Sequence, residues 1–326
     1  MFPLERPRRL RRTPAFRNLV AETVLTSADL VAPLFVAEGL ASPHPISSLP
    51  GQFQHTVESL LREVDEHLSN GVKAFMLFGV PVNKDEEGSG AWDPNGITQV
   101  ALRELKSRFG HEVVLMADLC LDEYTSHGHC GVLTPQGTVD NDSTIELYAQ
   151  IGIAQAQAGA DVVAPSGMMD GQVLAIRQGL DRAGFDDTAI LAYSAKYASA
   201  FYGPFREAVQ VEIANGGDRR GYQQDYRNRR EALREALGDI EQGADMVMVK
   251  PAMSYLDVLS DIAAAVDVPV SAYHVSGEYA MIKAAGERGW IDAPRVALEQ
   301  LTAVKRAGAN FILTYFANEI AEELNA

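Results

Sequence analysis

Short apolar runs alternate with longer helical patterns from Asp29 to the end of the chain, and this alternation constrains the fold most. The eight runs expected to form strands are Leu30–Glu38, Ala74–Val80, Val113–Cys120, Asp161–Ser166, Ile190–Lys196, Met246–Lys250, Val268–Val275 and Phe311–Phe316. The expected helices are Thr56–Asn70, Ile97–Arg108, Ser143–Ala158, Gly171–Ala183, Arg230–Gln242, Tyr255–Val266, Gly277–Ala307 in two pieces, and Asn318–Leu324. Eight alternations predict an α/β fold, a (β/α)8 TIM barrel.

Four helical patterns end at a glycine directly before the next strand, namely Gly71, Gly159, Gly243 and Gly308. Glycine accepts the left-handed backbone conformation that often ends a helix, so each glycine is a stop signal with a physical cause. A doubly wound open sheet would show the same local pattern. The count of eight and the absence of a glycine-rich dinucleotide-binding motif favour the barrel.

The composition allows either one large domain or two smaller ones. The chain has 326 residues, 47% of them hydrophobic, and a formal net charge of −16, which argues against nucleic acid as the main partner. No run approaches the about 18 apolar residues of a membrane helix, and no signal segment is evident, so we expect a cytoplasmic protein without a membrane partner. Two cysteines are too few for a disulfide framework and imply reducing conditions.

Residues 1–28 are expected to form an extended arm for subunit contacts, and residues 29–326 the catalytic barrel. Six arginines but only one acidic residue fall within the first 17 positions, ahead of an acidic body. Pro3, Pro7 and Pro14 oppose a helix there. We interpret the segment as an arm that wraps an acidic neighbouring subunit; a disordered tail is the alternative.

Two expected strands end in a lysine, Lys196 and Lys250. An ammonium group at the end of an apolar strand must reach water or lose its proton. A neutral amine can attack a carbonyl and form a Schiff base, and a second nearby cation favours the neutral form. A single lysine of this kind is more simply a side chain that reaches solvent. The pair favours chemistry at one shared site.

The third expected strand runs into a group of residues that can bind metal. Strand alternation places Asp118, Cys120 and Asp122 on one face, and a glycine-containing loop can return Cys130 to them. Two thiolates and a carboxylate suit zinc with one position left open. Two free thiols beside a solvated loop are the alternative, and the nearby His127 and His129 are ligands, proton carriers or loop residues.

Three long loops, Asn83–Asn95, Asp122–Asp140 and Tyr197–Arg229, follow strands two, three and five, on the face where barrel enzymes hold their active sites. The last of them combines Gly and Pro with aromatic residues and three arginines, which predicts a lid that pairs with carboxylates. The alternative is that the adjacent Arg219 and Arg220 are ordinary surface charges.

Together these segments resemble the 5-aminolevulinate dehydratase (porphobilinogen synthase) family, from about residue 10 to the end. The stretches that carry the resemblance are Tyr193-Ser-Ala-Lys196-Tyr-Ala-Ser-Ala-Phe-Tyr-Gly-Pro-Phe-Arg206, Met248-Val-Lys250-Pro-Ala, Tyr273-His-Val-Ser276-Gly-Glu-Tyr-Ala-Met-Ile and Thr125-Ser-His-Gly-His-Cys130-Gly. The resemblance implies a barrel with an N-terminal arm, assembled as a homo-octamer. It also implies a lyase that condenses two 5-aminolevulinate molecules to porphobilinogen, with loss of two waters, in tetrapyrrole (heme) synthesis.

The resemblance also implies roles by position. Lys250 and Lys196 would form Schiff bases with the first and second substrate, and Asp118 would transfer protons near the reacting carbons. Ser276 and Tyr315 would hold the first substrate's carboxylate, and Arg206 and Arg219 the second's.

The metal residues depart from the relatives. Zinc-type members carry three cysteines and magnesium-type members carry aspartates, whereas Cys120, Asp122 and Cys130 are a mixture; zinc is expected because magnesium does not seek thiolates. Glu235 matches an allosteric magnesium ligand of some relatives. However, Gly167 and Gln172 stand where those relatives have Asp and Arg.

Two rival functions remain open from the sequence. A class I aldolase also places a lysine at a barrel strand end, but it needs neither a second imine lysine nor a metal loop. The second rival is a catalytically silent relative that serves in assembly or regulation.

Overall fold

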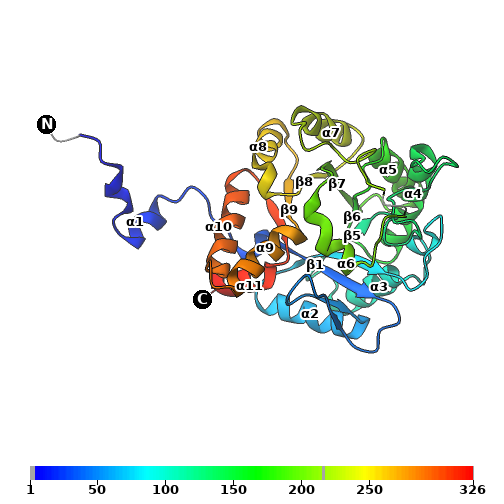
Figure 1. Ribbon diagram of the computed structural model, residues 1–326, viewed down its shortest axis with the longest axis horizontal. Helices are drawn as coiled ribbons and strands as arrows, with labels where there is room; N and C mark the ends of the chain where they lie inside the picture. The colour runs from blue at the N-terminus through cyan, green and yellow to red at the C-terminus, as the bar shows by residue number, and fades with distance from the viewer. Residues whose placement is uncertain (1–3, 215–216, 326) are drawn as a thin grey trace.

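The computed structural model describes residues 4–214 and 217–325, and its centre is a closed barrel of eight parallel strands (Figure 1). In the order in which they pair, the strands are β1 (Leu30–Ala37), β4 (Ala74–Val80), β5 (Val114–Leu119), β6 (Val162–Pro165), β7 (Ala189–Lys196), β8 (Met246–Lys250), β9 (Val270–His274) and β10 (Phe311–Thr314). Leu30 of β1 is in register with Ile312 of β10, which closes the ring. The predicted TIM barrel is therefore confirmed.

A short extension lies beside β1 and supports the barrel mouth. β2 (His44–Pro45) pairs antiparallel with β3 (Phe53–His55), and Phe35 of β1 is in register with Gln54 of β3. The Gln54 side chain donates to the carbonyl oxygen of Ala208 at 2.7 Å, so this extension also holds the predicted lid. The sequence patterns did not predict these two strands because each is too short to show a period.

Helices surround the barrel, as βαβ units require. They are α2 (Val57–Ser69), α3 (Ile97–Phe109), α4 (Asn141–Gln157), α5 (Gln172–Ala183), α7 (Arg230–Glu241), α8 (Leu256–Ala265), α9 (Ser276–Glu287), α10 (Ala293–Arg306) and α11 (Ala317–Asn325). α4 starts before the predicted Ser143 because Asp140 caps it, accepting from the backbone N–H of Ser143 at 3.2 Å. Among the described helices, none has both the length and the apolar character needed to cross a bilayer.

The four predicted stop glycines all adopt the left-handed conformation. Their φ angles are +85° at Gly71, +104° at Gly159, +105° at Gly243 and +118° at Gly308. A side chain would be strained at these angles, which explains why glycine occurs at these helix ends.

The predicted lid begins directly after β7. A 3-10 turn (Ala200–Tyr202) and the short helix α6 (Gly203–Ala208) cross toward the barrel axis (Figure 1). Ala208 and Val209 are fully buried, so this part of the segment is packed rather than solvated.

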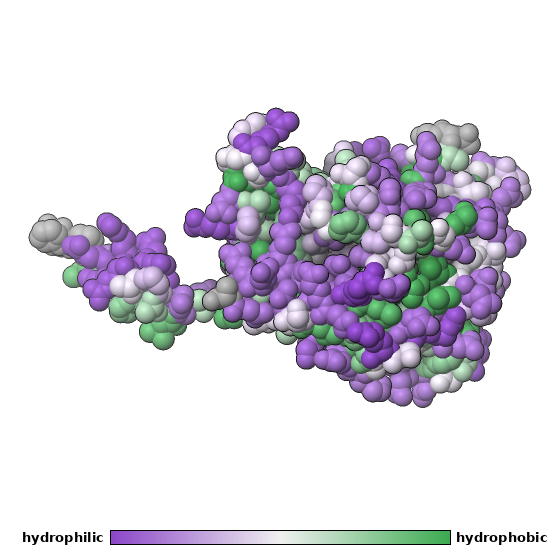
Figure 2. All heavy atoms as spheres, turned by 90° about the horizontal axis from the view of Figure 1, so that it is seen from below, coloured by the Kyte–Doolittle hydropathy of each residue, from purple (hydrophilic) through white to green (hydrophobic). Residues whose placement is uncertain are grey.

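The N-terminal segment projects away from the barrel, and most of its surface is hydrophilic (Figures 1 and 2). The expectation of an extended backbone is wrong in detail, because Pro7–Arg11 forms a 3-10 turn and Pro14–Leu19 forms helix α1. Pro14 occupies the first turn, where proline is tolerated because its missing N–H would have no partner in the helix. Thr13 caps α1 by accepting from the N–H of Phe16 at 3.2 Å. Subunit contact by this arm stays a prediction.

Candidate active site

The two strand-end lysines lie side by side. β7 and β8 are adjacent parallel strands, and Lys196 is in direct register with Lys250. Both side chains are buried at the carboxyl end of the barrel, the face that the sequence patterns indicated. The structure thus brings together two residues that the sequence predicted to share a site.

Aromatic rings surround the ammonium group of Lys250. Its Nζ lies 4.4 Å from the ring centre of Tyr273, 5.0 Å from that of Tyr193 and 5.1 Å from that of Phe205. Burial and the nearby charge of Lys196 together lower the pKa of Lys250 to about 7. Near neutral pH, a large fraction of Lys250 is therefore the neutral amine that a nucleophile requires.

Lys196 has a more polar environment. Its Nζ donates to the carbonyl oxygen of Ser166 on the adjacent β6–α5 connection. Burial lowers the pKa of Lys196, but the negative charge at Cys130, Cys120 and the carboxylates outweighs this, so the net shift is upward. Lys196 is therefore the cationic member of the pair.

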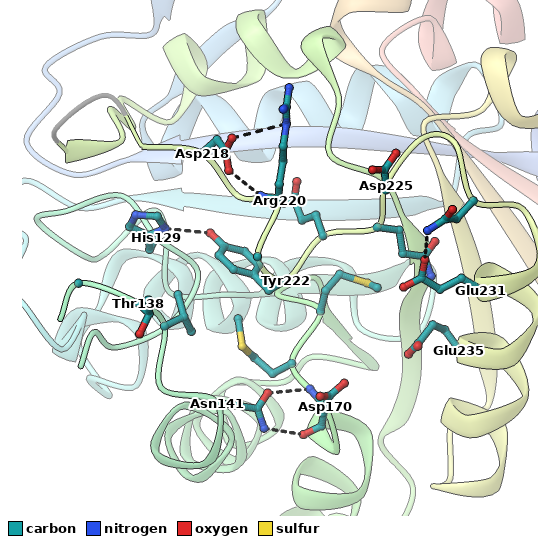
Figure 3. Close-up of a pocket in the computed structure, with 18 residues that line it drawn as sticks. His129, Thr138, Asn141, Asp170, Asp218, Arg220, Tyr222, Asp225, Glu231 and Glu235 are labelled. Carbon is teal, nitrogen blue, oxygen red and sulfur yellow. Dashed lines mark hydrogen bonds and ion pairs between the residues drawn. The ribbon is translucent and has the colours of Figure 1, made fainter. Parts of the chain in front are cut away.

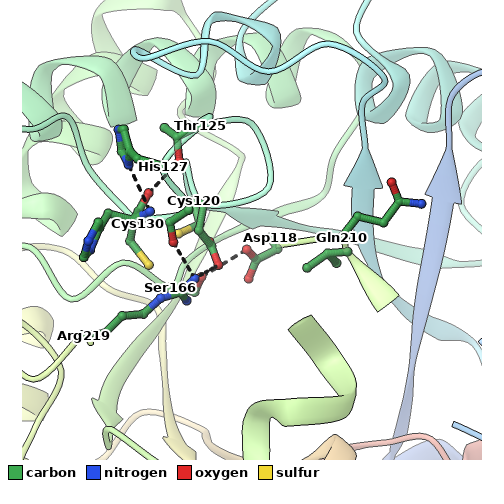
Figure 4. Close-up of polar contacts among 12 residues, drawn as sticks. Asp118, Cys120, Thr125, His127, Cys130, Ser166, Gln210 and Arg219 are labelled. Carbon is green, nitrogen blue, oxygen red and sulfur yellow. Dashed lines mark hydrogen bonds and ion pairs between the residues drawn. The ribbon is translucent and has the colours of Figure 1, made fainter. Parts of the chain in front are cut away.

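Asp118 is the penultimate residue of β5, and its carboxyl group points toward Ser166 (Figure 4) and is close enough to both lysines for their charges to lower its pKa. Its Oδ2 accepts a hydrogen bond from the Ser166 hydroxyl at 3.1 Å, while Oδ1 is buried without a partner among the described residues. Burial raises the pKa of Asp118 to about 6, although both lysines oppose this shift. A carboxyl group with this pKa and a free oxygen can accept or return a proton near neutral pH.

Cys120, Asp122 and Cys130 form a buried cluster next to Lys196, and their potential ligand atoms all lie within 4.8 Å of one another. Two sulfurs and one carboxylate oxygen are a donor set that fits zinc better than magnesium. Tyr148 on α4 contacts both cysteines of the cluster. Its hydroxyl donates to the carbonyl oxygen of Cys130 at 2.6 Å and lies 3.7 Å from the Cys120 sulfur.

His127 and His129 lie outside this metal cluster. His127 Nε2 is 3.1 Å from the carbonyl oxygen of Glu86, and His129 Nδ1 is 3.2 Å from the hydroxyl of Tyr222. Both rings therefore connect the metal loop to neighbouring segments, and a role of either histidine as a proton carrier stays a prediction.

The lid arginines lie at the same end of the barrel. Arg219 is buried and forms an ion pair with Asp122 at 2.8 Å, and it also donates to the carbonyl oxygen of Gly128 at 2.8 Å. The Nε atoms of Arg206 and Arg219 are buried without a partner among the described residues. These two N–H groups can donate hydrogen bonds to the carboxylate of a ligand.

Ser276 and Tyr315 are also buried. Ser276 starts α9, and its hydroxyl accepts from the N–H of Phe205 at 3.1 Å and donates to the carbonyl oxygen of Phe201 at 3.2 Å. The Tyr315 hydroxyl lies 3.0 Å from that of Tyr273, one of the rings around Lys250. The lid thus carries the two arginines and also contacts Ser276.

Comparison with known proteins agrees with this geometry. The sequence profile of the family described as "Delta-aminolevulinic acid dehydratase" matches residues 4–323. The chain belongs to the delta-aminolevulinic acid dehydratase family. A family member from Streptomyces coelicolor is 58% identical over 325 residues, covering 99% of this chain and 98% of the relative. One from Mycobacterium tuberculosis is 56% identical over 322 residues, covering 98% and 97%.

A solved structure extends the comparison to the backbone. The delta-aminolevulinic acid dehydratase of Toxoplasma gondii ME49, described in complex with its reaction product porphobilinogen, superposes with a TM-score of 0.96. It is 47% identical, and the match covers 98% of this chain and 92% of that one. The predictions of the family and of an enzyme are confirmed.

The region expected to hold an allosteric magnesium ion in this dehydratase lies away from the lysines. Glu235 on α7 and Asp170 both line a cavity of about 590 Å³ (Figure 3). Gly167 leaves room for Tyr148, because a Cβ there would lie 1.7 Å from the tyrosine hydroxyl oxygen. Gln172 is buried and accepts from the N–H of Met169 at 3.1 Å. These two residues serve local packing, and magnesium at Glu235 stays a prediction.

Several residues of the dehydratase site were not assigned a role from the sequence. Tyr193 lies under both lysines, and Lys84 donates to the carbonyl oxygens of Val209 and Gln210, which fastens the lid. Tyr222 contacts the metal loop through its hydroxyl, 3.4 Å from the N–H of Cys130. Tyr193 had a local signal, since it lies on the strand of Lys196. The others make contacts between distant segments, which no local pattern reveals.

Proposed function

We propose that this chain condenses two molecules of 5-aminolevulinate to porphobilinogen through Schiff bases on Lys250 and Lys196, as a step in tetrapyrrole synthesis. The observation that carries the proposal is the pair of buried lysines in direct register, one of them with a pKa of about 7. Membership of the dehydratase family and the likeness to a relative described with porphobilinogen support the same substrate and product.

Lys250 is the first nucleophile in this proposal. Its neutral amine attacks the ketone of the first substrate, and loss of water from the adduct leaves an imine. The rings of Tyr273 and Phe205 keep the nitrogen in a poorly solvated place, which protects the imine from hydrolysis. Ser276 and Tyr315 orient the carboxylate of this substrate.

Lys196 starts as the cation and must lose a proton before it can attack the second ketone. Asp118 is the acceptor nearby, because its Oδ1 is without a partner among the described residues and its pKa of about 6 suits exchange near neutrality. Asp118 then moves protons between the two substrates as bonds form between them. Arg206 and Arg219 bind the second carboxylate.

Cys120, Asp122 and Cys130 would hold a zinc ion in this proposal. When bound, zinc supplies a Lewis acid next to the second substrate. Tyr148 orients Cys130 and Arg219 orients Asp122 through these contacts. We further propose that the chain works in the cytoplasm as a homo-oligomer, an octamer, with the arginine-rich arms joining subunits.

Reductive trapping tests the proposal. The protein is incubated with excess 5-aminolevulinate, treated with borohydride and digested, and the labelled lysines are identified by mass spectrometry. Label at both Lys196 and Lys250, with porphobilinogen formed in the untreated sample, is the expected result. Lys84 is an internal control, because its pKa is also lowered by burial but its Nζ is bonded to two lid carbonyls.

The other outcomes separate the rival functions. Label at Lys250 alone in excess substrate indicates an aldolase-like enzyme with one imine. Absence of label at both lysines indicates a silent relative and contradicts the proposal.

A further inference from the structure

Glu278 is a buried acidic residue that the proposed reaction does not use. It lies in the first turn of α9 and is only 1% exposed. Its Oε2 accepts from the N–H of Val275 at 2.7 Å, and its Oε1 accepts from the N–H of Met253 at 2.7 Å. The carboxylate therefore connects the segment after β9 with the segment after β8.

The bond to Val275 has a simple structural explanation. An acidic residue at the third position of a helix commonly accepts from the backbone N–H of the capping residue, here Val275, and so helps to start α9. This bond alone would require only one of the two carboxylate oxygens.

The bond to Met253 is not explained by helix capping. Met253 belongs to a different βα unit and follows Lys250 by three positions. Burial raises the pKa of Glu278 to about 7, although the N–H groups of Val275, Met253 and Ala252 favour the charged form. Burying a carboxylate away from water costs free energy, and the two hydrogen bonds from backbone N–H groups offset this cost.

Both ends of this bridge carry residues of the active site. On one side, the segment held through Met253 begins at Lys250, the proposed nucleophile. On the other side, α9 begins at Ser276, whose hydroxyl bonds to the lid at Phe201 and Phe205. α9 also packs closely on the lid, since a Cβ at Gly277 would lie 2.6 Å from the carbonyl oxygen of Phe201.

We propose that Glu278 is a positioning residue, which fixes the Lys250 side chain relative to Ser276 and the lid by joining their two backbone segments. The inference rests on the proposed function, because it assigns Glu278 to the imine formed at Lys250. Glu278 itself touches no substrate; it acts through the main chain at Met253 and Val275.

The test compares two variants that alter this bridge differently. In Glu278→Gln, the shape is kept, but the amide NH₂ faces one of the two backbone N–H groups and cannot accept from it. In Glu278→Asp, the charge is kept and the shorter side chain can still cap α9, but it no longer reaches Met253. Asp292→Ala is the matched control, because Asp292 caps α10 by accepting from the N–H of Arg295 and lies outside the site.

We expect both Glu278 variants to slow borohydride trapping of 5-aminolevulinate at Lys250 by about 10- to 100-fold, as a small misplacement of a reacting group does. Trapping at Lys196 should stay at the wild-type rate, and Asp292→Ala should lower the melting temperature without slowing either lysine. If Glu278→Gln does not fold, Glu278→Asp decides the question.

Two results would overturn the inference. One is wild-type trapping at Lys250 in a folded Glu278→Asp variant, which would reduce Glu278 to a helix cap. The other is an equal loss of trapping at both lysines, which would indicate a general loss of structure. An unlabelled wild-type protein would be a different result, since it refutes the proposed function itself.

Discussion

Lys196 and Lys250 are register partners on neighbouring strands, yet their pKa values shift in opposite directions. Carboxylates and cysteines surround Lys196, whereas aromatic rings surround Lys250. In the proposed reaction, the neutral lysine therefore attacks first, and the charged lysine must release a proton before it attacks the second substrate.

The rate of imine trapping at Lys250 should rise with pH through about 7. An ammonium group cannot attack a ketone, so the reactive fraction is small below this pKa and nearly complete above it. Trapping at pH 6 should be about tenfold slower than the plateau above pH 8. Single-turnover trapping across this range, quantified by mass spectrometry at Lys250, measures it. A midpoint near the ordinary lysine value would contradict the assignment.

Lys250→Ala should abolish turnover, and Lys250→Arg should abolish it equally. Arginine keeps the positive charge, but its guanidinium stays protonated and cannot form the imine. Lys283→Arg is the control, because Lys283 forms a surface ion pair with Glu319 in which arginine can replace lysine. Porphobilinogen formation is the readout, and substantial activity in either Lys250 variant would remove this lysine from the mechanism.

Removing zinc should lower turnover more than it lowers trapping at Lys250. The metal cluster lies beside Lys196 and so concerns the second substrate, whereas the first imine needs only Lys250. Cys130→Ser should reproduce the effect of a strong chelator, and added zinc should restore the chelated wild type but not this variant. If elemental analysis finds no zinc and activity survives chelation, both cysteines are ordinary thiols and not metal ligands.

Arg219→Met should destabilise the fold by about 3–5 kcal/mol, because Asp122 would be left as a buried charge without its partner. The adjacent Arg220→Met is a matched control, since the Arg220 side chain is 75% exposed and its ion pair with Asp218 lies at the surface. Chemical denaturation of both variants in the same buffer, without added metal, gives the comparison. Equal stability of the two would mean that Asp122 has another compensating partner.

Removal of residues 1–17 should leave a folded barrel in a smaller assembly. Residues 4–17 include no buried side chain, and the excess of arginines in the arm suits contact with the acidic surface of another subunit. A full-length variant with the six arginines changed to glutamine separates the effect of charge from that of length. Sedimentation gives the assembly mass, and an unchanged mass after truncation would support the disordered-tail alternative.

Local chemistry explains which features could be predicted from the sequence. Left-handed glycines such as Gly159, and strands that end in Lys196 and Lys250, leave their signal within a few residues. Proline did not prevent a helix in the arm, since Pro14 lies in the first turn of α1, where a helix tolerates it.

Contacts between distant segments could not be predicted in this way. The ion pair of Arg219 with Asp122 and the bond of Glu278 to Met253 join separate loops, and each residue alone resembles a surface charge or a helix cap. The different pKa values of the two lysines likewise depend on neighbours that only the closed barrel brings together.

The pairing of Leu30 with Ile312 has a consequence for biosynthesis. The ring closes only when β10 pairs with Leu30 and Val31, so a nascent chain on the ribosome carries this end of β1 with an open edge until β10 has been translated. Open strand edges invite association with other chains, and a partly made barrel is exposed to this risk throughout synthesis. A stop codon just before β10 would release a product with nearly every residue of the proposed site but with two open edges, a substrate for chaperones and proteases instead of an enzyme.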